Sequence, residues 1–130
     1  MAPPISGLRS LVSLAVLAAI ACSDGREPLT VYSPHDRAIL AAVEQAFERD
    51  HPEIDMRWLD MGSQEILDRL RFENPNPVAD VWFGGPTTIF HRGVAEGVLE
   101  PSSPDWGSAV DSGGIGPDGL YWPVYRTRAV

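Results

Sequence analysis

The sequence predicts an α/β fold with a parallel sheet, in the order strand, helix, strand, helix, strand, helix. Three short runs at 29–32, 53–60 and 81–83 are rich in β-branched, aromatic or alternating apolar residues, as is typical of strands. Each run is followed by a stretch with apolar residues at helical spacing. The connections are short enough for right-handed crossovers between parallel strands, which favours this fold class.

The first strand is expected at Leu29–Tyr32 and is ended by Ser33-Pro34. Asp36 is a candidate N-cap for the helix that follows it. The apolar positions of that helix recur at helical spacing and are Ile39, Val43, Ala46 and Phe47. The pattern stops before Pro52, so this segment is expected to be an amphipathic helix.

The second strand is expected at Glu53–Asp60, where apolar and polar residues alternate as in a half-exposed strand. Gly62 and Ser63 then turn the chain, and Ser63 is a candidate N-cap. The apolar stripe of the next helix consists of Ile66, Leu67 and Leu70. Two prolines within Asn74–Pro77 are expected to end this helix.

The third strand is expected at Val81–Phe83, a short apolar run typical of a strand covered on both faces. Gly84-Gly85-Pro86 ends it, and a helix through Ile89 and Phe90 follows. A further strand is expected at Leu120–Tyr125. The apolar pattern there has no closing element before the sequence stops, which favours a truncated reading frame.

Residues 1–21 are typical of an export signal, with Arg9 ahead of an apolar run too short to span a bilayer. A buried core helix is the alternative. Cys22 follows directly, and this junction resembles a bacterial lipoprotein signal, in which the cysteine is lipidated. A plain secretory signal cleaved nearby remains open. The polar residues 22–28 are expected to be a linker, and residues 29–130 the folded part.

The composition is acidic, with a formal net charge of −8 and no lysine. No basic run or basic helix face is present, so neither nucleic acid nor an anionic membrane surface is an expected partner. Contact with a membrane is expected through the lipid on Cys22 alone.

Small and polar residues follow all three expected strands. Because the carboxyl ends of parallel strands share one edge of a sheet, these residues are expected to form a ligand-binding face there. Hydroxyl groups and helix N-termini suit a polar or anionic solute. Ordinary strand-to-helix turns are the alternative interpretation. The candidate binding residues are Ser33, His35, Gly62, Ser63, Gly84, Gly85, Thr87 and Thr88.

His35 is the most reactive residue of this set, either as a metal ligand or as a hydrogen-bonding or capping group. One histidine makes neither a metal site nor a catalytic pair. The sequence has no phosphate-binding loop, no paired histidines at metal spacing and no serine between glycines in a nucleophile elbow. Asp80 lies beside the third strand and is expected to hold a backbone N–H or an arginine. We therefore expect neither an enzyme nor a bound cofactor.

In combination, several segments resemble the bacterial extracellular solute-binding proteins of ABC transporters, in the branch that includes ferric-iron binders. The segments that carry the resemblance are Val31–His35, Phe47–Pro52, Pro77–Pro86, Gly97–Pro101 and Gly119–Val124.

This resemblance implies a type II periplasmic-binding-protein-like fold, in which two α/β lobes close on a solute and present it to a membrane permease. Residues 29–130 would then be an incomplete first lobe, with most of the second lobe missing, in the periplasm or on the cell surface. In the iron binders, a histidine near the end of the first strand and an acidic residue after the third hold the metal, together with two tyrosines from the other lobe. His35 stands near the first position, but Gly84-Gly85 offers no carboxylate at the second. Ferric iron, an oxyanion, a phosphonate, a polyamine and a sugar-like solute all remain open.

Two other interpretations remain open as well. One is a surface-anchored α/β hydrolase whose catalytic residues lie in a missing part. The other is a nonfunctional fragment that buries too little apolar surface to fold stably.

Overall fold

The computed structural model describes residues 25–124 of the 130-residue chain. It confirms the expected alternation of strands and helices. The elements, in chain order, are β1 (Glu27–Ser33), α2 (Arg37–Asp50), β2 (Ile54–Asp60), α3 (Ser63–Glu73), β3 (Val81–Trp82) and α4 (Thr87–Ala95). Three short 3-10 helices follow, namely η2 (Asp105–Ala109), η3 (Ser112–Gly114) and η4 (Pro117–Gly119).

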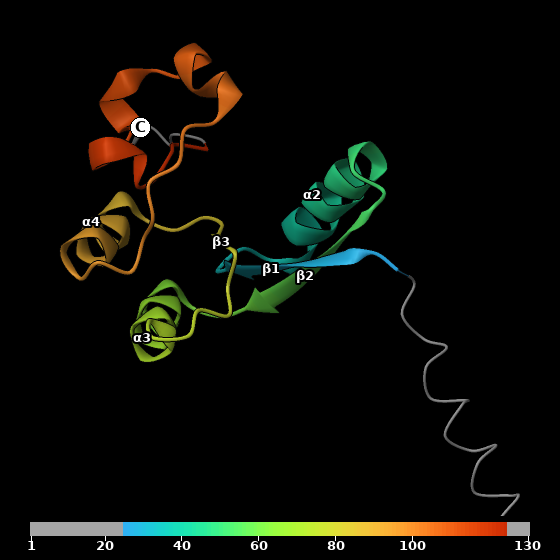
Figure 1. The fold of residues 1–130 in the computed structure, drawn as a ribbon, viewed down its shortest axis with the longest axis horizontal. Helices are drawn as coiled ribbons and strands as arrows, with labels where there is room; N and C mark the ends of the chain where they lie inside the picture. Colours follow the sequence, from blue (N-terminus) through green and yellow to red (C-terminus); the bar gives the residue numbers. More distant parts are fainter. Residues whose placement is uncertain (1–24, 125–130) are drawn as a thin grey trace, which may run out of the picture.

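The three strands form one parallel sheet in the order β2-β1-β3. The chain therefore moves from β1 to β2 in one direction and returns across β1 to reach β3. Right-handed crossovers in opposite directions place their helices on opposite faces of the sheet. Figure 1 shows this arrangement, with α2 on one side of the sheet and α3 and α4 on the other. All three carboxyl ends lie at one edge, where Ser33 is paired in register with Asp60.

The core lies on both faces of the central strand β1. Tyr32 is fully buried on the side of α3, and its hydroxyl donates to the Glu73 carboxylate at 2.9 Å. Arg69 Nε donates to the same hydroxyl at 2.9 Å. Burial raises the pKa of Tyr32, and the hydrogen bond to Glu73 adds to the rise. The other buried apolar side chains are Val31, Leu40, Met56, Ile66, Leu67 and Ile89.

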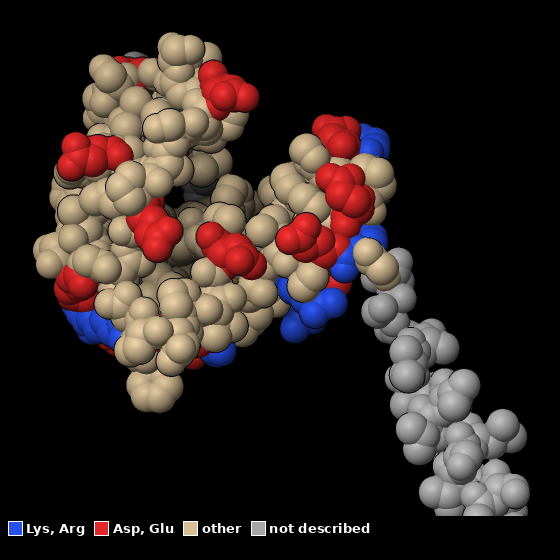
Figure 2. Space-filling view, viewed as in Figure 1, with Lys and Arg blue, Asp and Glu red and all other residues tan. Residues whose placement is uncertain are grey.

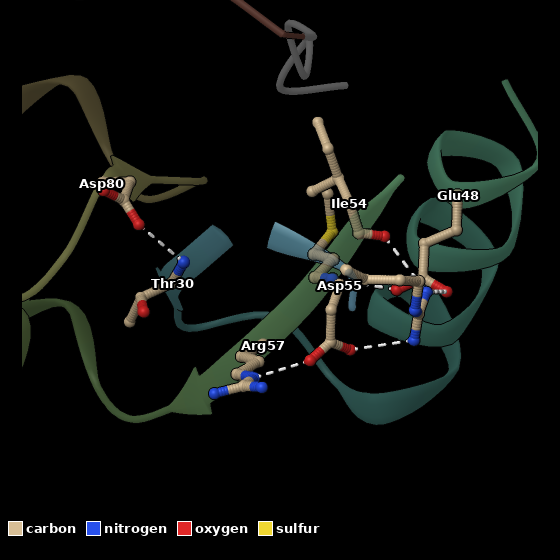
Figure 3. A network of polar contacts seen from close by, with 8 residues as sticks. Thr30, Glu48, Ile54, Asp55, Arg57 and Asp80 are labelled. Carbon is tan, nitrogen blue, oxygen red and sulfur yellow. Dashed lines mark hydrogen bonds and ion pairs between the residues drawn. The ribbon is translucent and has the colours of Figure 1, made fainter. Parts of the chain in front are cut away.

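A polar network fixes the start of β1 against α2 and β2 (Figure 3). The Arg26 guanidinium forms ion pairs with Glu48 at 2.8 Å and Asp55 at 3.0 Å, and also donates to the Ile54 carbonyl at 3.0 Å. The backbone N–H of Met56 donates to Glu48 at 2.8 Å. That hydrogen bond, followed by the contact with Arg26, lowers the pKa of Glu48.

Asp80 ties β3 to β1, as Figure 3 also shows. Its Oδ2 accepts from the backbone N–H of Thr30 at 2.8 Å, and its own N–H donates to the Thr30 carbonyl at 2.9 Å. The expectation that Asp80 holds a backbone N–H is confirmed.

Two expectations about the strands are wrong. β3 is an edge strand of this sheet, and Val81 is 42% exposed, so the strand is not covered on both faces. No strand forms over the described part of Leu120–Tyr125, which ends at residue 124. Its backbone bonds locally instead, because the Leu120 N–H donates to the Pro117 carbonyl and the Tyr121 carbonyl accepts from the Gly116 N–H. The Tyr121 ring lies 5.5 Å from Phe90 of α4, and the Trp122 ring packs edge-on against Trp106.

The described helices include none long and apolar enough to cross a membrane. The expected export signal and Cys22 lie outside the described residues.

Candidate functional site

His35 and Gly84 meet at the carboxyl edge of the sheet. A Cβ atom placed on Gly84 would lie 2.2 Å from His35 Nε2 and 2.6 Å from Cδ2, so the imidazole occupies the space that any side chain at 84 would need. Gly84 also has φ +89°, a left-handed conformation that favours glycine. The ends of β1 and β3 are thus in direct contact.

Two neighbours of His35 shape the end of β1. Ser33 is fully buried, and its Oγ accepts from the backbone N–H of His35 at 3.2 Å. The Asp36 carboxylate accepts from the N–H groups of Ala38 and Ile39 at 2.9 and 3.1 Å, which confirms Asp36 as the N-cap of α2. The N-terminus of α2 is therefore already occupied by a carboxylate of the chain.

A contact between Ser63 and Gly85 brings the segment after β2 next to the segment after β3, at the carboxyl edge of the sheet. The Oγ of Ser63 lies 3.4 Å from the position of a Cβ on Gly85, whose φ is +133°. Ser63 was expected to cap α3, but this is wrong: Gly62 is the N-cap and Ser63 is the first helical residue. Because Gly62 has no side chain, α3 begins without a side-chain cap.

The start of α4 completes the edge. Pro86 is its N-cap and makes no side-chain cap hydrogen bond, while Thr87 and Thr88 are exposed in the first turn. The first N–H groups of a helix have no acceptor within it. The N-termini of α3 and α4 thus offer backbone donors near Gly84 and Gly85, whereas that of α2 is capped.

Sequence reasoning missed an aromatic contact that supports this edge. The Phe83 ring lies 5.3 Å from the His35 ring, edge-on, and 5.9 Å from the Trp58 ring. Phe83 donates its backbone N–H to the Tyr32 carbonyl at 2.9 Å, which fixes its place beside β1. The sequence placed Trp58 in the alternating second strand and Phe83 in the apolar third strand, but their contact depends on the strand order.

The described residues contain no group of three or more His, Cys, Asp and Glu side chains able to hold a metal ion. His35 therefore has no set of metal-ligating partners in this part of the chain. His51 and His91 lie elsewhere, against Phe47 and Tyr121 respectively.

Figure 2 shows the molecule hollowed between the segment of 3-10 helices and α2, with acidic side chains spread over this face. In the same view, the chain that leaves β3 toward α4 passes below the hollow.

Six of the eight candidate residues have a clear place at the sheet edge: His35 meets Gly84, Ser63 meets Gly85, and Thr87 and Thr88 begin α4. Gly62 is exposed just before α3, while Ser33 is buried beneath His35.

Comparison with known proteins gives one curated relative. It is the probable ABC transporter periplasmic-binding protein y4fP of Sinorhizobium fredii (strain NBRC 101917 / NGR234), 32% identical over 123 residues. The match spans 93% of this chain and 33% of the relative, so the chain covers about a third of that protein's length. No family model matches the sequence.

Two solved structures share the fold. One is described as Trichodesmium IdiA (FutA) in complex with iron and citrate, with a TM-score of 0.65 and 18% identity, covering 72% of this chain and 29% of that one. The other is the periplasmic binding protein P5PA, with a TM-score of 0.59 and 23% identity, covering 64% of this chain and 26% of that one. The resemblance to extracellular solute-binding proteins of ABC transporters, and the periplasmic-binding-protein-like α/β fold, are confirmed.

Proposed function

We propose that this chain is part of the solute-binding component of an ABC import system, which captures a small polar or anionic solute and delivers it to a permease. One observation carries the proposal: His35 and Ser63, from two strand ends, converge on Gly84-Gly85 at the third. This is the edge at which open α/β sheets bind ligands. The y4fP relative, a probable periplasmic-binding protein, supports the same role.

The solute is proposed to meet mainly backbone N–H groups. α3 and α4 both begin at this edge without side-chain caps, and their positive dipole ends favour negative charge. Ser63, Thr87 and Thr88 add hydroxyl groups, and His35 adds a ring nitrogen. Because a glycine backbone allows close approach, Gly84 and Gly85 form one wall of the proposed cleft.

Ferric iron is the second candidate solute. It is favoured by the position of His35 and by the fold shared with an iron-citrate complex. The absence of a metal-ligand cluster within residues 25–124 and the glycines at 84 and 85 favour an anionic solute instead. In this proposal any metal would need ligands from outside the described residues.

We further propose that the protein is exported, with residues 1–21 as the signal and Cys22 as the lipid-anchored first residue of the mature chain. Its place would then be the periplasm or the cell surface, facing a permease. The proposed role is binding without turnover.

Calorimetry on the 130-residue protein tests the role, with inorganic phosphate, ferric citrate and putrescine as probes. Saturable binding of one probe is expected, together with no turnover in a screen of ester and phosphate-ester substrates. Gly97→Ala is the matched control for Gly84→Ala, because both glycines have a positive φ but a Cβ at 97 meets no neighbouring atom. Binding that is weakened by the change at 84 alone supports the proposal. Turnover of any substrate, or binding that both variants leave unchanged, would contradict it.

A further inference from the structure

A cavity on the α2 side of the sheet adjoins the strand-end site, because Asp60 pairs in register with Ser33 and the Trp58 ring contacts Phe83. Its volume is about 470 Å³, and it is open to solvent between α2 and the end of β2. We call it the α2–β2 pocket. Its lining residues are Arg37, Leu40, Ala41, Glu44, Trp58 and Asp60.

The pocket follows from the periodicity of the two elements. Positions 37, 40, 41 and 44 lie on one face of α2, because side chains three, four and seven residues apart are neighbours on a helix. Trp58 and Asp60 are two residues apart on β2 and so point to the same face of the sheet. Apolar side chains therefore line the base of the pocket, and charged groups from α2 and from β2 lie at its sides.

The charges of the pocket have no partners in the described part of the chain. Arg37, Glu44 and Asp60 make no ion pair and no side-chain hydrogen bond among residues 25–124. Most other arginines there are paired, namely Arg26, Arg49, Arg57, Arg69 and Arg71. A cation and two carboxylates with unused hydrogen-bonding capacity therefore line a single cavity.

We propose that the α2–β2 pocket binds a small zwitterion, with its anionic group on Arg37 and its ammonium group between Glu44 and Asp60. The guanidinium presents a planar fork that matches a carboxylate, sulfonate or phosphonate. The backbones of Arg37 and Glu44 are about 10 Å apart along the helix axis, and both side chains are long enough for their charged ends to approach a zwitterion with a short linker.

The same charges select against simpler solutes. Two carboxylates repel a lone anion, and Arg37 repels a lone cation, so only a molecule with both charges gains at both ends. Leu40, Ala41 and the Trp58 ring suit the methylene groups between them, and the ring also attracts an ammonium group. The pocket adjoins the strand-end site at Trp58 and Asp60, whereas Arg37 and Glu44 line the pocket alone, so changes on α2 test the pocket separately.

Titrations of ¹⁵N-labelled 130-residue protein test this binding. The probes are β-alanine and 2-aminoethanesulfonate as zwitterions, with propionate and propylammonium as controls of similar size and single charge. Saturable shifts of the Trp58 indole N–H signal are expected with the zwitterions, at a Kd of about 1 mM or tighter. Equal shifts with the single-charge probes, or no saturable shift with either zwitterion, would overturn the proposal.

Two variants locate the site. Arg37→Gln and Asp60→Asn each replace a charged group with a neutral amide, and Asp60→Asn also keeps side-chain size, so each is expected to weaken zwitterion binding about tenfold or more. Arg49→Gln, at the other end of α2 and 69% exposed, is the matched control and is expected to change nothing. Zwitterion binding that survives Arg37→Gln but is lost in Gly84→Ala would place the ligand at the strand ends. That result would overturn the pocket while leaving the proposed solute-binding role intact.

Discussion

The imidazole of His35 lies against the backbone of Gly84, so that the end of β1 and the end of β3 are held together without any side chain at 84. The contact depends on the sheet order β2-β1-β3, which makes these two strands neighbours. A side chain at 84 would have to displace the imidazole, and φ +89° also favours glycine there.

Gly84→Ala is expected to lower the free energy of unfolding by about 2–4 kcal/mol, because it combines left-handed strain with a steric clash against His35. Gly97→Ala separates the two causes, since Gly97 has φ +66° but open space around a Cβ. That control is expected to cost about 1–2 kcal/mol. Urea denaturation measures both, and equal losses would show that the His35 contact has no energetic effect.

Asp80→Ala is expected to lower the free energy of unfolding by about 1 kcal/mol, because the Thr30 N–H loses its acceptor. β3 has only two residues, so faster hydrogen exchange at the Phe83 amide, which bonds to Tyr32, is also expected. Asp80→Asn retains an acceptor oxygen and is expected to restore most of the loss. Asp50→Ala, at an exposed ion pair, serves as the control. Unchanged exchange at Phe83 in Asp80→Ala would contradict this role.

Glu48 is expected to make stability depend on pH in the acid range. The Met56 N–H, and then Arg26, lower the pKa of Glu48 in the folded protein. The unfolded chain therefore takes up a proton first as the pH falls. The contribution of Glu48 to the free energy of unfolding is complete above its unfolded pKa of about 4.5. It is lost as the pH drops through the lowered pKa of the folded state.

In Glu48→Gln, the free energy of unfolding is thus expected to fall less steeply below about pH 4.5 than in the unchanged protein. Glu44→Gln is a matched control on the same helix and is expected to retain the steep fall. Parallel curves for the unchanged protein and Glu48→Gln would show that the Arg26 network does not act through this carboxylate.

Tyr32→Phe is expected to lower the free energy of unfolding by about 1 kcal/mol at neutral pH, because Glu73 and Arg69 lose the buried hydroxyl that they share. The raised pKa of Tyr32 also predicts an effect in alkali. The contribution of the Tyr32 hydroxyl to the free energy of unfolding is complete below about pH 10, near the unfolded pKa. It is lost as the pH rises through the raised pKa of the folded state. Denaturation curves between neutral and alkaline pH should therefore fall less steeply for the variant, and identical slopes would contradict the burial of this phenol.

The sequence predicted the local structure well where periodicity and capping decide it. α2 runs from Arg37 to Asp50 as its apolar spacing indicated, and Asp36 caps it. Pairing of the parallel strands followed from the alternation of strands and helices. The carboxyl-edge location of His35, Ser63 and Gly84 was predictable for the same reason.

Features that depend on tertiary contacts were not predictable. The order β2-β1-β3 leaves Val81 at an edge, although its apolar run suggested full coverage. The segment of Tyr121 and Trp122 makes local backbone hydrogen bonds, such as Leu120 to Pro117, so its β propensity is not realised as a strand. The α2–β2 pocket likewise arises only when two elements come together, because no spacing within one segment brings Arg37 near Asp60.

The central claim is that the strand ends form a solute-binding face, and amide chemical-shift mapping tests it most directly. ¹⁵N-labelled protein is titrated with inorganic phosphate, ferric citrate and putrescine in turn. The account predicts that one probe gives saturable shifts concentrated at Ser63, Gly85, Thr87 and Thr88, with Gly97 unaffected as the internal control. Shifts absent from these four amides with every probe would contradict it.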